Sequence, residues 1–445
     1  MLESTDSLLK FQVAVSCFAA QRMLGVLPLS GSKPLRSVQE LLYETGEAAK
    51  KDFRTNTLLF GAFQLGDKAQ SAFAELVSDA MTLKMLNPGY MMDVVSGLAQ
   101  GSADAVTSVA STDALGLLTE QFRNTGDVLG FVNDVDAPEE LSADGTYPLD
   151  EQIHKFYSRG DYPALWLVEG LGERYARAHM TKGREVRDLL TSGKGGALPD
   201  KAQLMMHAGM GITFAKDAID ELTPWSSETR VKGALRRFLH LVRLNSMPGY
   251  EGAALESLGL VTQTWYAQLV SVIADQLLAL DADATEFFWH GAGRAMYFSP
   301  MYMLPGLSPW DAADREPPDD TARRNARAGV AWAFTIVNVR QPKITAHFLQ
   351  HKADRISDND AYANGVHSTL IMAGEMFPGH KYVSEFCRFQ PDADEPELVS
   401  SWNRHIGHDA ADEIDESRRA LKAHHQLGEV FRYHDLPQFV ADLDV

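Results

Sequence analysis

The sequence has little cysteine, with only Cys17 and Cys387 among its 445 residues. Two cysteines cannot form the disulfide framework that holds many small secreted domains together. Uninterrupted apolar runs of about 18 residues, which a transmembrane helix requires, are also missing. The chain begins with acidic residues, and Gln12, Gln21 and Arg22 interrupt the apolar stretch that follows, which is not typical of a signal peptide. We therefore expect a soluble protein of the cytoplasm.

Positive charge is scarce as well. The chain has 41 lysines and arginines against 60 aspartates and glutamates, so its formal net charge is −19. Nucleic acids and anionic membranes both require a basic surface, and we therefore expect neither as a partner. The Walker A, dinucleotide-binding, GxSxG, CxxC and HExxH motifs are absent too. This argues against nucleotide-dependent and nicotinamide-dependent chemistry, and we expect no cofactor.

Helical patterns dominate what is present. Segments 37–53, 266–280 and 415–434 place apolar residues three and four positions apart, with strong helix formers between them. Alternating runs of Val, Ile and Thr, which are typical of strands, are rare. The sequence therefore predicts an all-α fold.

A short pattern recurs along the chain: a glycine, one spacer and then a small residue, leading into an apolar helical run. The copies are Gly170-Leu-Gly172, Gly209-Met-Gly211, Gly252-Ala-Ala254, Gly291-Ala-Gly293, Gly329-Val-Ala331 and a degenerate Gly365-Val-His367. The first glycines lie 39, 43, 39, 38 and 36 residues apart, and Gly61 and Gly101 extend the series weakly toward the N-terminus. The alternative is chance spacing in a chain with 34 glycines.

Glycine within a helix costs about 1 kcal/mol relative to alanine, and close approach of a neighbouring backbone is the usual compensation. A period near 39 residues accommodates two helices and two turns. We therefore predict stacked helical hairpins, as in an α-solenoid. The predicted divisions are an N-terminal helical region with weak repeats (1–150), a repeat domain (151–395) and a C-terminal helical tail (396–445).

The repeat segments resemble a known bacterial family. They read VEGLGERY, HAGMGITFA, GYEGAALESLGL, HGAGRAMYFSP, RAGVAWAF and YANGVHSTL. Over residues 150–380 they are similar to the domain of unknown function 1702 family, whose members carry successive Gly-x-Gly helical motifs. One of these motifs is like Gly291-Ala-Gly293-Arg294, followed by an aromatic at Phe298. The resemblance implies a role in the biosynthesis of enediyne and related polyketide natural products, and it assigns no catalytic residues. The chain departs from the family in a Pro- and Asp-rich insertion at 305–320 and in its charged C-terminal tail.

Polar residues occur just before the repeat glycines. They are Glu169, His207, Glu251, His290, Arg327 and Asn364. In a stacked repeat, equivalent positions form a ladder along one face, where acid and base groups can act on one ligand. The alternative is that these residues cap helix starts, which suits Asn364 and the glutamates. Capping explains the two histidines and Arg327 less well, because positive charge is unfavourable at a helix N-terminus.

From this ladder we take Glu169, Glu251 and His290 as candidate acid–base groups. The candidate substrate-binding residues are His207, Arg294, Arg327, Asn364, Trp289 and Tyr297. The two aromatic residues come from the stretches 287–289 and 296–303, which either wall an apolar pocket for a long unsaturated ligand or belong to the core.

Two further patterns are weak. His347 and His351 are spaced i, i+4, so that both imidazoles can face one metal ion, but a solvated helix face is the commoner outcome. We expect no metal site. Asp319-Asp320 is a possible magnesium-binding pair, yet it follows two prolines and precedes an Arg-rich segment, as acidic helix starts do.

The sequence leaves two functions open. The first is a biosynthetic protein that binds an apolar, polyene-like intermediate and catalyses a cofactor-independent cyclisation or isomerisation, with other biosynthetic proteins as possible partners. The alternative is a non-catalytic α-solenoid that acts as a scaffold or sequesters the product.

Overall fold

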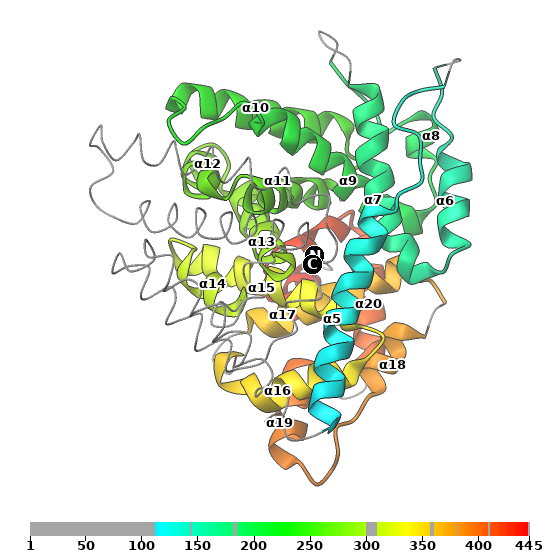
Figure 1. The fold of residues 1–445 in the computed structure, drawn as a ribbon, viewed down its shortest axis with the longest axis vertical. Coiled ribbons are helices and arrows are strands. Elements are labelled where there is room, and N and C mark those ends of the chain that lie inside the picture. Colours follow the sequence, from blue (N-terminus) through cyan, green and yellow to red (C-terminus); the bar gives the residue numbers. More distant parts are fainter. Residues whose placement is uncertain are drawn as a thin grey trace, which may run out of the picture. The chain divides into compact units, whose positions relative to one another are not determined.

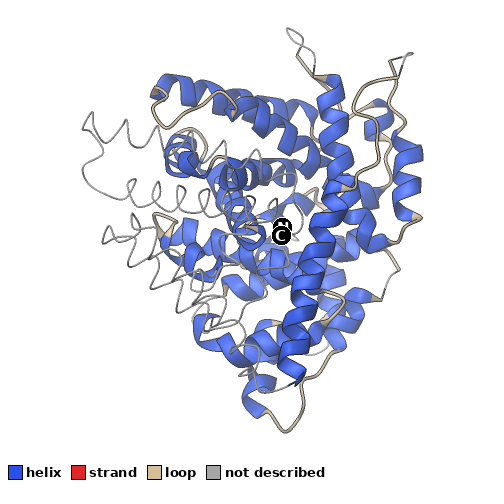
Figure 2. Ribbon diagram, in the orientation of Figure 1, coloured by secondary structure: helices blue, strands red, loops and turns tan. Residues whose placement is uncertain are grey.

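The computed structural model describes residues 112–142, 145–180, 185–299, 309–356, 360–379, 381–407 and 410–443. Every regular element in these ranges is a helix, as Figure 2 shows, and the all-α prediction is thereby confirmed. Within the same ranges, no helix combines the length and the apolarity needed to cross a bilayer. The weak repeats predicted around Gly61 and Gly101 lie outside the described residues.

Six of the described helices pack one against the next in chain order, and we call them the inner row (Figure 1). They are α7 (Asp161–His179), α9 (Asp200–Ile219), α11 (Glu251–Trp265), α13 (Ala282–Phe298), α15 (Asp320–Asn338) and α17 (Ala361–Met376). Between consecutive members the chain passes through a second helix. These connecting helices are α8 (Gly193–Gly196), α10 (Glu228–Asn245), α12 (Val270–Leu278) with η3 (Ala267–Leu269), α14 (Pro309–Arg315) and α16 (Pro342–Ile356). The arrangement is the predicted repeat of helical hairpins.

Side-chain caps help to set where some inner helices begin. The Asp281 carboxylate accepts the backbone N–H of Ala284 at 3.0 Å at the start of α13. The Asp319 carboxylate accepts the N–H of Ala322 at 2.8 Å at the start of α15. Each bond satisfies a donor that the first helical turn leaves open. Asp319 therefore serves as the start of a helix, as its position after two prolines indicates.

Repeat glycines let neighbouring inner helices touch backbone to backbone. A Cβ added at Gly209, Gly291 or Gly329 would collide with a carbonyl oxygen of the preceding inner helix. Thr213, one turn after Gly209, donates its hydroxyl to the carbonyl of Glu173 at 2.8 Å. Gly209 lies against the carbonyl of Glu169, and Thr213, four residues later, bonds to the carbonyl of Glu173, also four residues later. The helices α7 and α9 therefore run in the same direction, as a hairpin repeat requires.

The predicted repeat register is wrong in α11. Gly252 lies in the first turn and faces the carbonyl of Gly428 and the ring of Phe287. The positions equivalent to the repeat glycines are Ser257, whose hydroxyl donates to Ala208 O at 2.8 Å, and Gly259, which meets Phe288 O. The predicted pattern required a glycine at the first small position. In α11 that position is a serine, Ser257, which lies five residues after Gly252.

Gly170 departs from the prediction in a different way. The helix that carries it, α7, is the first member of the inner row and has no earlier inner helix to meet. A Cβ at Gly170 would instead collide with the side chain of Val135. The close contact is therefore made with the segment between α5 (Thr112–Asn133) and α6 (Leu149–Tyr157).

The inner row curls back on itself. Tyr162, at the start of α7, donates its hydroxyl to the carbonyl of Val337 near the end of α15 at 2.9 Å. The Tyr162 ring also lies 6.5 Å from the ring of Phe377, which directly follows α17. Helix α5 packs against α7, α15 and α16. The first and last repeats are therefore in contact.

The C-terminal elements pack onto the same unit. They are α18 (Tyr382–Arg388), α19 (Pro396–His405), α20 (Ala411–Ala423), η4 (Leu427–Phe431) and α21 (Leu436–Leu443). Lys422 of α20 reaches both Glu375 of α17 at 2.6 Å and Asp200 of α9 at 2.7 Å. The described residues belong to one compact unit, which spans 111–302 and 308–445. The sequence-based boundaries at 150 and 395 stay predictions.

Candidate functional site

Four ionisable side chains from three inner helices meet in the interior, and we call them the buried charge cluster. Arg294 of α13 donates to Glu169 Oε1 of α7 through Nη2 at 2.6 Å, and to Glu256 Oε2 of α11 through Nη1 at 3.0 Å. His290 Nδ1 lies 3.0 Å from Glu256 Oε1. No more than 5% of any of these residues is exposed. Charged groups are rarely buried so completely unless they are paired, as they are here.

The repeat explains why these residues meet. Glu169, Glu256 and His290 each directly precede the first small residue of a repeat, namely Gly170, Ser257 and Gly291. Arg294 follows His290 by four positions and so shares its helix face. Close approach of the helix backbones at the small residues brings these side chains within hydrogen-bonding distance. The ladder expected from the sequence therefore forms in part, with Glu256 as the member from α11.

The two carboxylates have opposite pKa shifts. Burial raises the pKa of Glu169, and the attraction of Arg294 offsets only part of that effect. Burial acts on Glu256 in the same direction, but Arg294 and His290 together hold its pKa below the usual range. The pKa of Arg294 is raised, because the two glutamates outweigh the effect of its burial. Glu256 is therefore ionised, and Glu169 retains a proton more readily than an exposed glutamate.

An ionised carboxylate only accepts hydrogen bonds, so the proton of a neutral His290 sits on Nδ1 and is donated to Glu256. Nε2 is then the basic nitrogen, and it has no hydrogen-bond partner among the described residues. The rings of Trp332 and Phe431 meet the imidazole edge-on, with centroids at 6.3 and 6.4 Å. The bond to Glu256 thus fixes the tautomer of the neutral His290 ring, and two aromatic rings lie against that ring.

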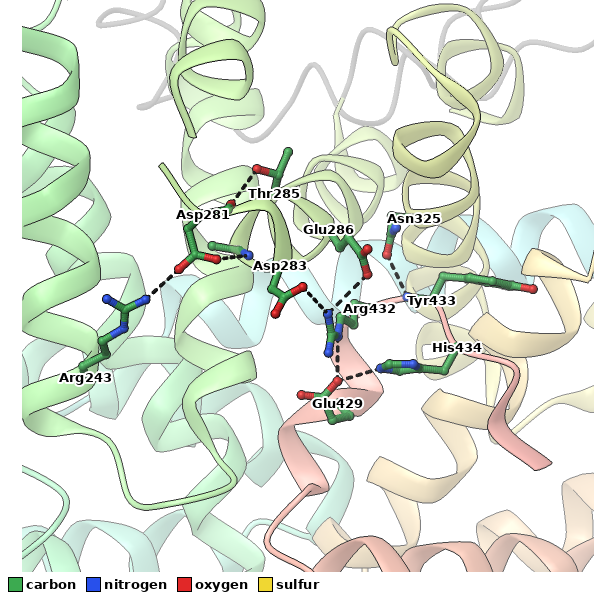
Figure 3. A network of polar contacts seen from close by, with 11 residues as sticks. Arg243, Asp281, Asp283, Thr285, Glu286, Asn325, Glu429, Arg432, Tyr433 and His434 are labelled. Carbon is green, nitrogen blue, oxygen red and sulfur yellow. Dashed lines mark hydrogen bonds and ion pairs between the residues drawn. The ribbon is translucent and has the colours of Figure 1, made fainter. Parts of the chain in front are cut away.

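Residues 427–434, which we call the C-terminal strap, include Phe431 and contact α11, α13 and α17 of the inner row through η4. Figure 3 shows Glu429, Arg432, Tyr433 and His434 of this strap beside the inner helices. Arg432 contacts Glu286 of α13 at 3.3 Å and Glu429 at 2.6 Å. Asn325 of α15 accepts the backbone N–H of Tyr433 at 2.7 Å. These contacts fix the strap along its length and so hold Phe431 against His290.

Six of the nine candidate residues lie outside the cluster, and two of these six, Glu251 and His207, have structural roles. Glu251 stands at the first position of α11 and accepts the N–H of Gly249 at 2.7 Å. His207 uses both ring nitrogens: Nδ1 bonds to Gln203 O at 2.7 Å, and Nε2 accepts the N–H of Met247 at 3.0 Å. Burial lowers the pKa of His207 to about 4. Its imidazole is therefore a neutral, fully bonded core group.

The remaining candidates have partners of their own. Arg327 forms an ion pair with Asp314. Asn364 of α17 donates to the carbonyl of His434 at 2.6 Å and so helps to anchor the strap. Trp289 is buried edge-on against Phe288, with ring centroids at 5.6 Å. The hydroxyl of Tyr297 lies 3.4 Å from Thr125 Oγ1 and 3.5 Å from Asn338 Nδ2. The contacts of these two aromatic residues are those of core side chains.

No group of three or more His, Cys, Asp or Glu side chains is arranged to hold a metal ion in the part of the chain that the structure describes. His347 and His351 both lie on α16, and the side chain of His351 is outside the described residues.

Sequence reasoning missed three residues of this region: Glu256, Trp332 and Phe431. A search for any small residue, rather than glycine, at the first repeat position would have found Ser257 and with it Glu256. Trp332 follows Gly329 by three positions, as Arg294 follows Gly291. No local signal marks Phe431, because its contact with His290 joins positions far apart in the sequence.

Comparisons with protein-family models, with curated proteins and with solved structures return no match.

Proposed function

We propose that the protein is a cofactor-independent acid–base enzyme that isomerises or cyclises an apolar, polyene-like intermediate of polyketide type. The observation that carries this proposal is the buried His290–Glu256 pair, in which Glu256 engages Nδ1 and Nε2 has no partner among the described residues. A carboxylate behind an imidazole fixes its tautomer and stabilises the imidazolium that forms when the other nitrogen takes a proton.

In the proposed reaction, Nε2 of neutral His290 removes a proton from a carbon of the substrate. The ionised Glu256 stabilises the resulting imidazolium through Nδ1–H, and Arg294 holds Glu256 in place from the other side. The imidazolium then returns the proton to a different carbon of the same molecule. Substrate and product contain the same atoms and electrons, so this isomerisation requires no oxidant, reductant or second substrate.

The opposite pKa shifts of the two glutamates support this proposal. Enzymes that use paired acid and base groups place them in environments that push their pKa values apart. Here Glu169, whose pKa is raised, and Glu256, whose pKa is lowered, share one arginine. Glu169 is the candidate proton donor when the reaction is a cyclisation that begins with protonation.

Two observations support the apolar substrate class. The rings of Trp332 and Phe431 both lie edge-on against the imidazole. The repeat segments resemble a family associated with polyketide gene clusters. The alternative of a scaffold relies on the extended concave face that open solenoids offer to partners. The contacts of α7 with α15 and with Phe377 leave less of such a face in the described part of the chain.

Product titre tests the proposal, because it does not require the substrate to be known in advance. The chromosomal gene of a producing strain is replaced by His290→Gln or by Glu256→Gln. We expect product formation to fall by about 10²–10⁴-fold, the usual range for loss of a general acid or base, with accumulation of an upstream intermediate.

The matched control is His367→Gln. His367 is also a shielded histidine, but its Nε2 bonds to the carbonyl of Ile406 at 3.1 Å. Titre should stay near the wild-type level in this strain, with soluble protein measured in all strains. Normal titre in the His290→Gln and Glu256→Gln strains at normal protein level would reject the enzyme and leave the scaffold or sequestering function.

A further inference from the structure

Three nitrogen atoms beside one another's side chains have no hydrogen-bond partner among the described residues. They are Nε2 of His290, Nε of Arg294 and the indole Nε1 of Trp332. The guanidinium carbon of Arg294 lies 4.9 Å from the centre of the Trp332 ring, and the His290 ring meets the same indole. All three side chains are at least 98% buried. Buried polar groups in native proteins are nearly always bonded, so three such nitrogens on neighbouring side chains call for a partner that the described residues do not supply.

The chemistry of these nitrogens defines what they bind. Arginine Nε–H and indole Nε1–H only donate, so their partner must be an acceptor atom. Oxygen is the common acceptor, and the neighbouring rings of Trp332 and Phe431, with centroids 5.7 Å apart, favour a ligand that is otherwise apolar. The ligand is therefore apolar and carries at least one oxygen atom.

The charges around Arg294 further restrict the class of ligand. Arg294 already carries one buried carboxylate on each terminal nitrogen, from Glu169 and Glu256. A ligand carboxylate would add another negative charge beside the ionised Glu256 and the Glu169 carboxyl group in a poorly solvated place, which is unfavourable. A neutral carbonyl accepts the same hydrogen bonds without this repulsion.

We propose that Arg294 Nε and Trp332 Nε1 form a carbonyl-binding subsite for an apolar ketone, ester or thioester, next to the basic nitrogen of His290. This inference rests on the proposed function and names the substrate class of that site. A carbonyl held there makes the protons on the adjacent carbon more acidic, because its oxygen is stabilised as negative charge develops. Arg294 and Trp332 thereby become polarising groups for the base His290.

Calorimetric titration of the purified full-length protein tests the subsite, with 2-nonanone and nonanoate as probes of equal chain length. We expect 2-nonanone to bind at least about ten times more tightly than nonanoate. Trp332→Phe keeps the ring and removes the N–H, and it should weaken 2-nonanone binding by about 5- to 30-fold, the loss expected for one buried hydrogen bond.

The matched control is Trp402→Phe. Trp402 of α19 is a second buried tryptophan whose Nε1 has no partner among the described residues, and it lies on a different helix from the cluster. Its substitution should leave 2-nonanone binding unchanged. Equal binding by the two variants, tighter binding of nonanoate, or no binding of either probe at millimolar concentration overturns the subsite. Equal binding of the two variants would mean that only ordered water meets the indole of Trp332.

A spectroscopic readout keeps the test valid if Trp332→Phe does not fold. The seven tryptophans give seven indole N–H resonances in a ¹H–¹⁵N spectrum, which single Trp→Phe variants at the other six positions assign by elimination. Addition of 2-nonanone should shift the Trp332 resonance downfield, as a new hydrogen bond does, and leave that of Trp402 in place. An unshifted Trp332 resonance at saturating probe overturns the subsite.

His290→Gln separates this inference from the proposed function. The variant keeps Arg294 and Trp332, so it should still bind 2-nonanone while product titre is lost. Binding that depends on Trp332, together with normal titre for His290→Gln, would leave the subsite standing and reject the acid–base enzyme.

Discussion

Individual residues of the core show that burial by itself does not make a functional group. His207 and His290 are both fully buried, yet their ring nitrogens differ in what they bond. Backbone groups occupy both nitrogens of His207, whereas His290 has a carboxylate on one nitrogen and no partner among the described residues on the other. The two hydrogen bonds to the backbone stabilise the neutral form of His207 in a single tautomer. At His290 the absence of a partner for Nε2 among the described residues is the feature on which the proposed function rests.

His207 makes a pH-dependent contribution to stability. Its pKa is about 4 in the folded protein, against an ordinary value of 6.5. As the pH falls below 6.5 the unfolded chain takes up the proton first, so the free energy of unfolding decreases until about pH 4. His207 should account for about 2 kcal/mol of the stability lost between pH 7.5 and pH 5. Urea unfolding of His207→Gln at the two pH values should therefore show a smaller loss than that of the wild type.

Burial also lowers the pKa values of His367 and His405, so some pH dependence should persist in this variant. An unchanged difference between pH 7.5 and pH 5 in His207→Gln would contradict the assignment.

At the scale of helices, small residues determine how the elements pack. The inner helices approach so closely that a side chain larger than the hydrogen of glycine would collide with the neighbouring backbone. This applies at Gly209, Gly259, Gly291 and Gly329. Gly233, on the exposed side of α10, has no such role, because an added Cβ there would find nothing within 4 Å. The same residue type is therefore obligatory at one helical position and unfavourable at another.

Gly259→Ala and Gly233→Ala should change stability in opposite directions. The Cβ at position 259 would overlap the backbone of Phe288, so α11 and α13 must separate, at a cost of at least about 2 kcal/mol. At position 233 alanine improves helix propensity and should stabilise the protein by about 0.5–1 kcal/mol. Chemical denaturation of the two variants measures both effects. A neutral Gly259→Ala would refute the corrected register of α11.

On the scale of the whole described unit, the return of the inner row distinguishes this fold from an open array. In an open solenoid each repeat contacts only its neighbours, and stability is close to a sum of local terms. Here Tyr162 joins the start of α7 to the end of α15, and Lys422 joins α17 to α9. Opening one end of the row therefore disrupts contacts at the other.

We expect α7 and α15 to unfold together. In native-state hydrogen exchange, their most protected amides should share one free energy of opening, and Tyr162→Phe should lower both values by about 1 kcal/mol through loss of one buried hydrogen bond. Separate opening energies, with α15 unaffected by Tyr162→Phe, are the result expected of an open array and would contradict the closed arrangement.

Local sequence determined the helices and most of the repeat, because helix periodicity and glycine spacing act within about 40 residues. The positions of Glu169, His290 and Arg294 relative to their repeat glycines were predictable for the same reason. The sequence pattern did not identify Glu256, because a serine replaces the glycine in its repeat. Only the contact of Ser257 with Ala208 identifies that replacement.

Only the tertiary structure decided which of these residues meet. Arg294 joins Glu169, 125 positions away, and Phe431 covers His290 from 141 positions away. Such contacts depend on the angle between successive helices, and a small angle at each step accumulates along the row. The repeat period specifies the order of the helices but not that angle. Helix packing therefore determines which residues form the buried charge cluster, whereas the sequence determines which residue types each helix contributes.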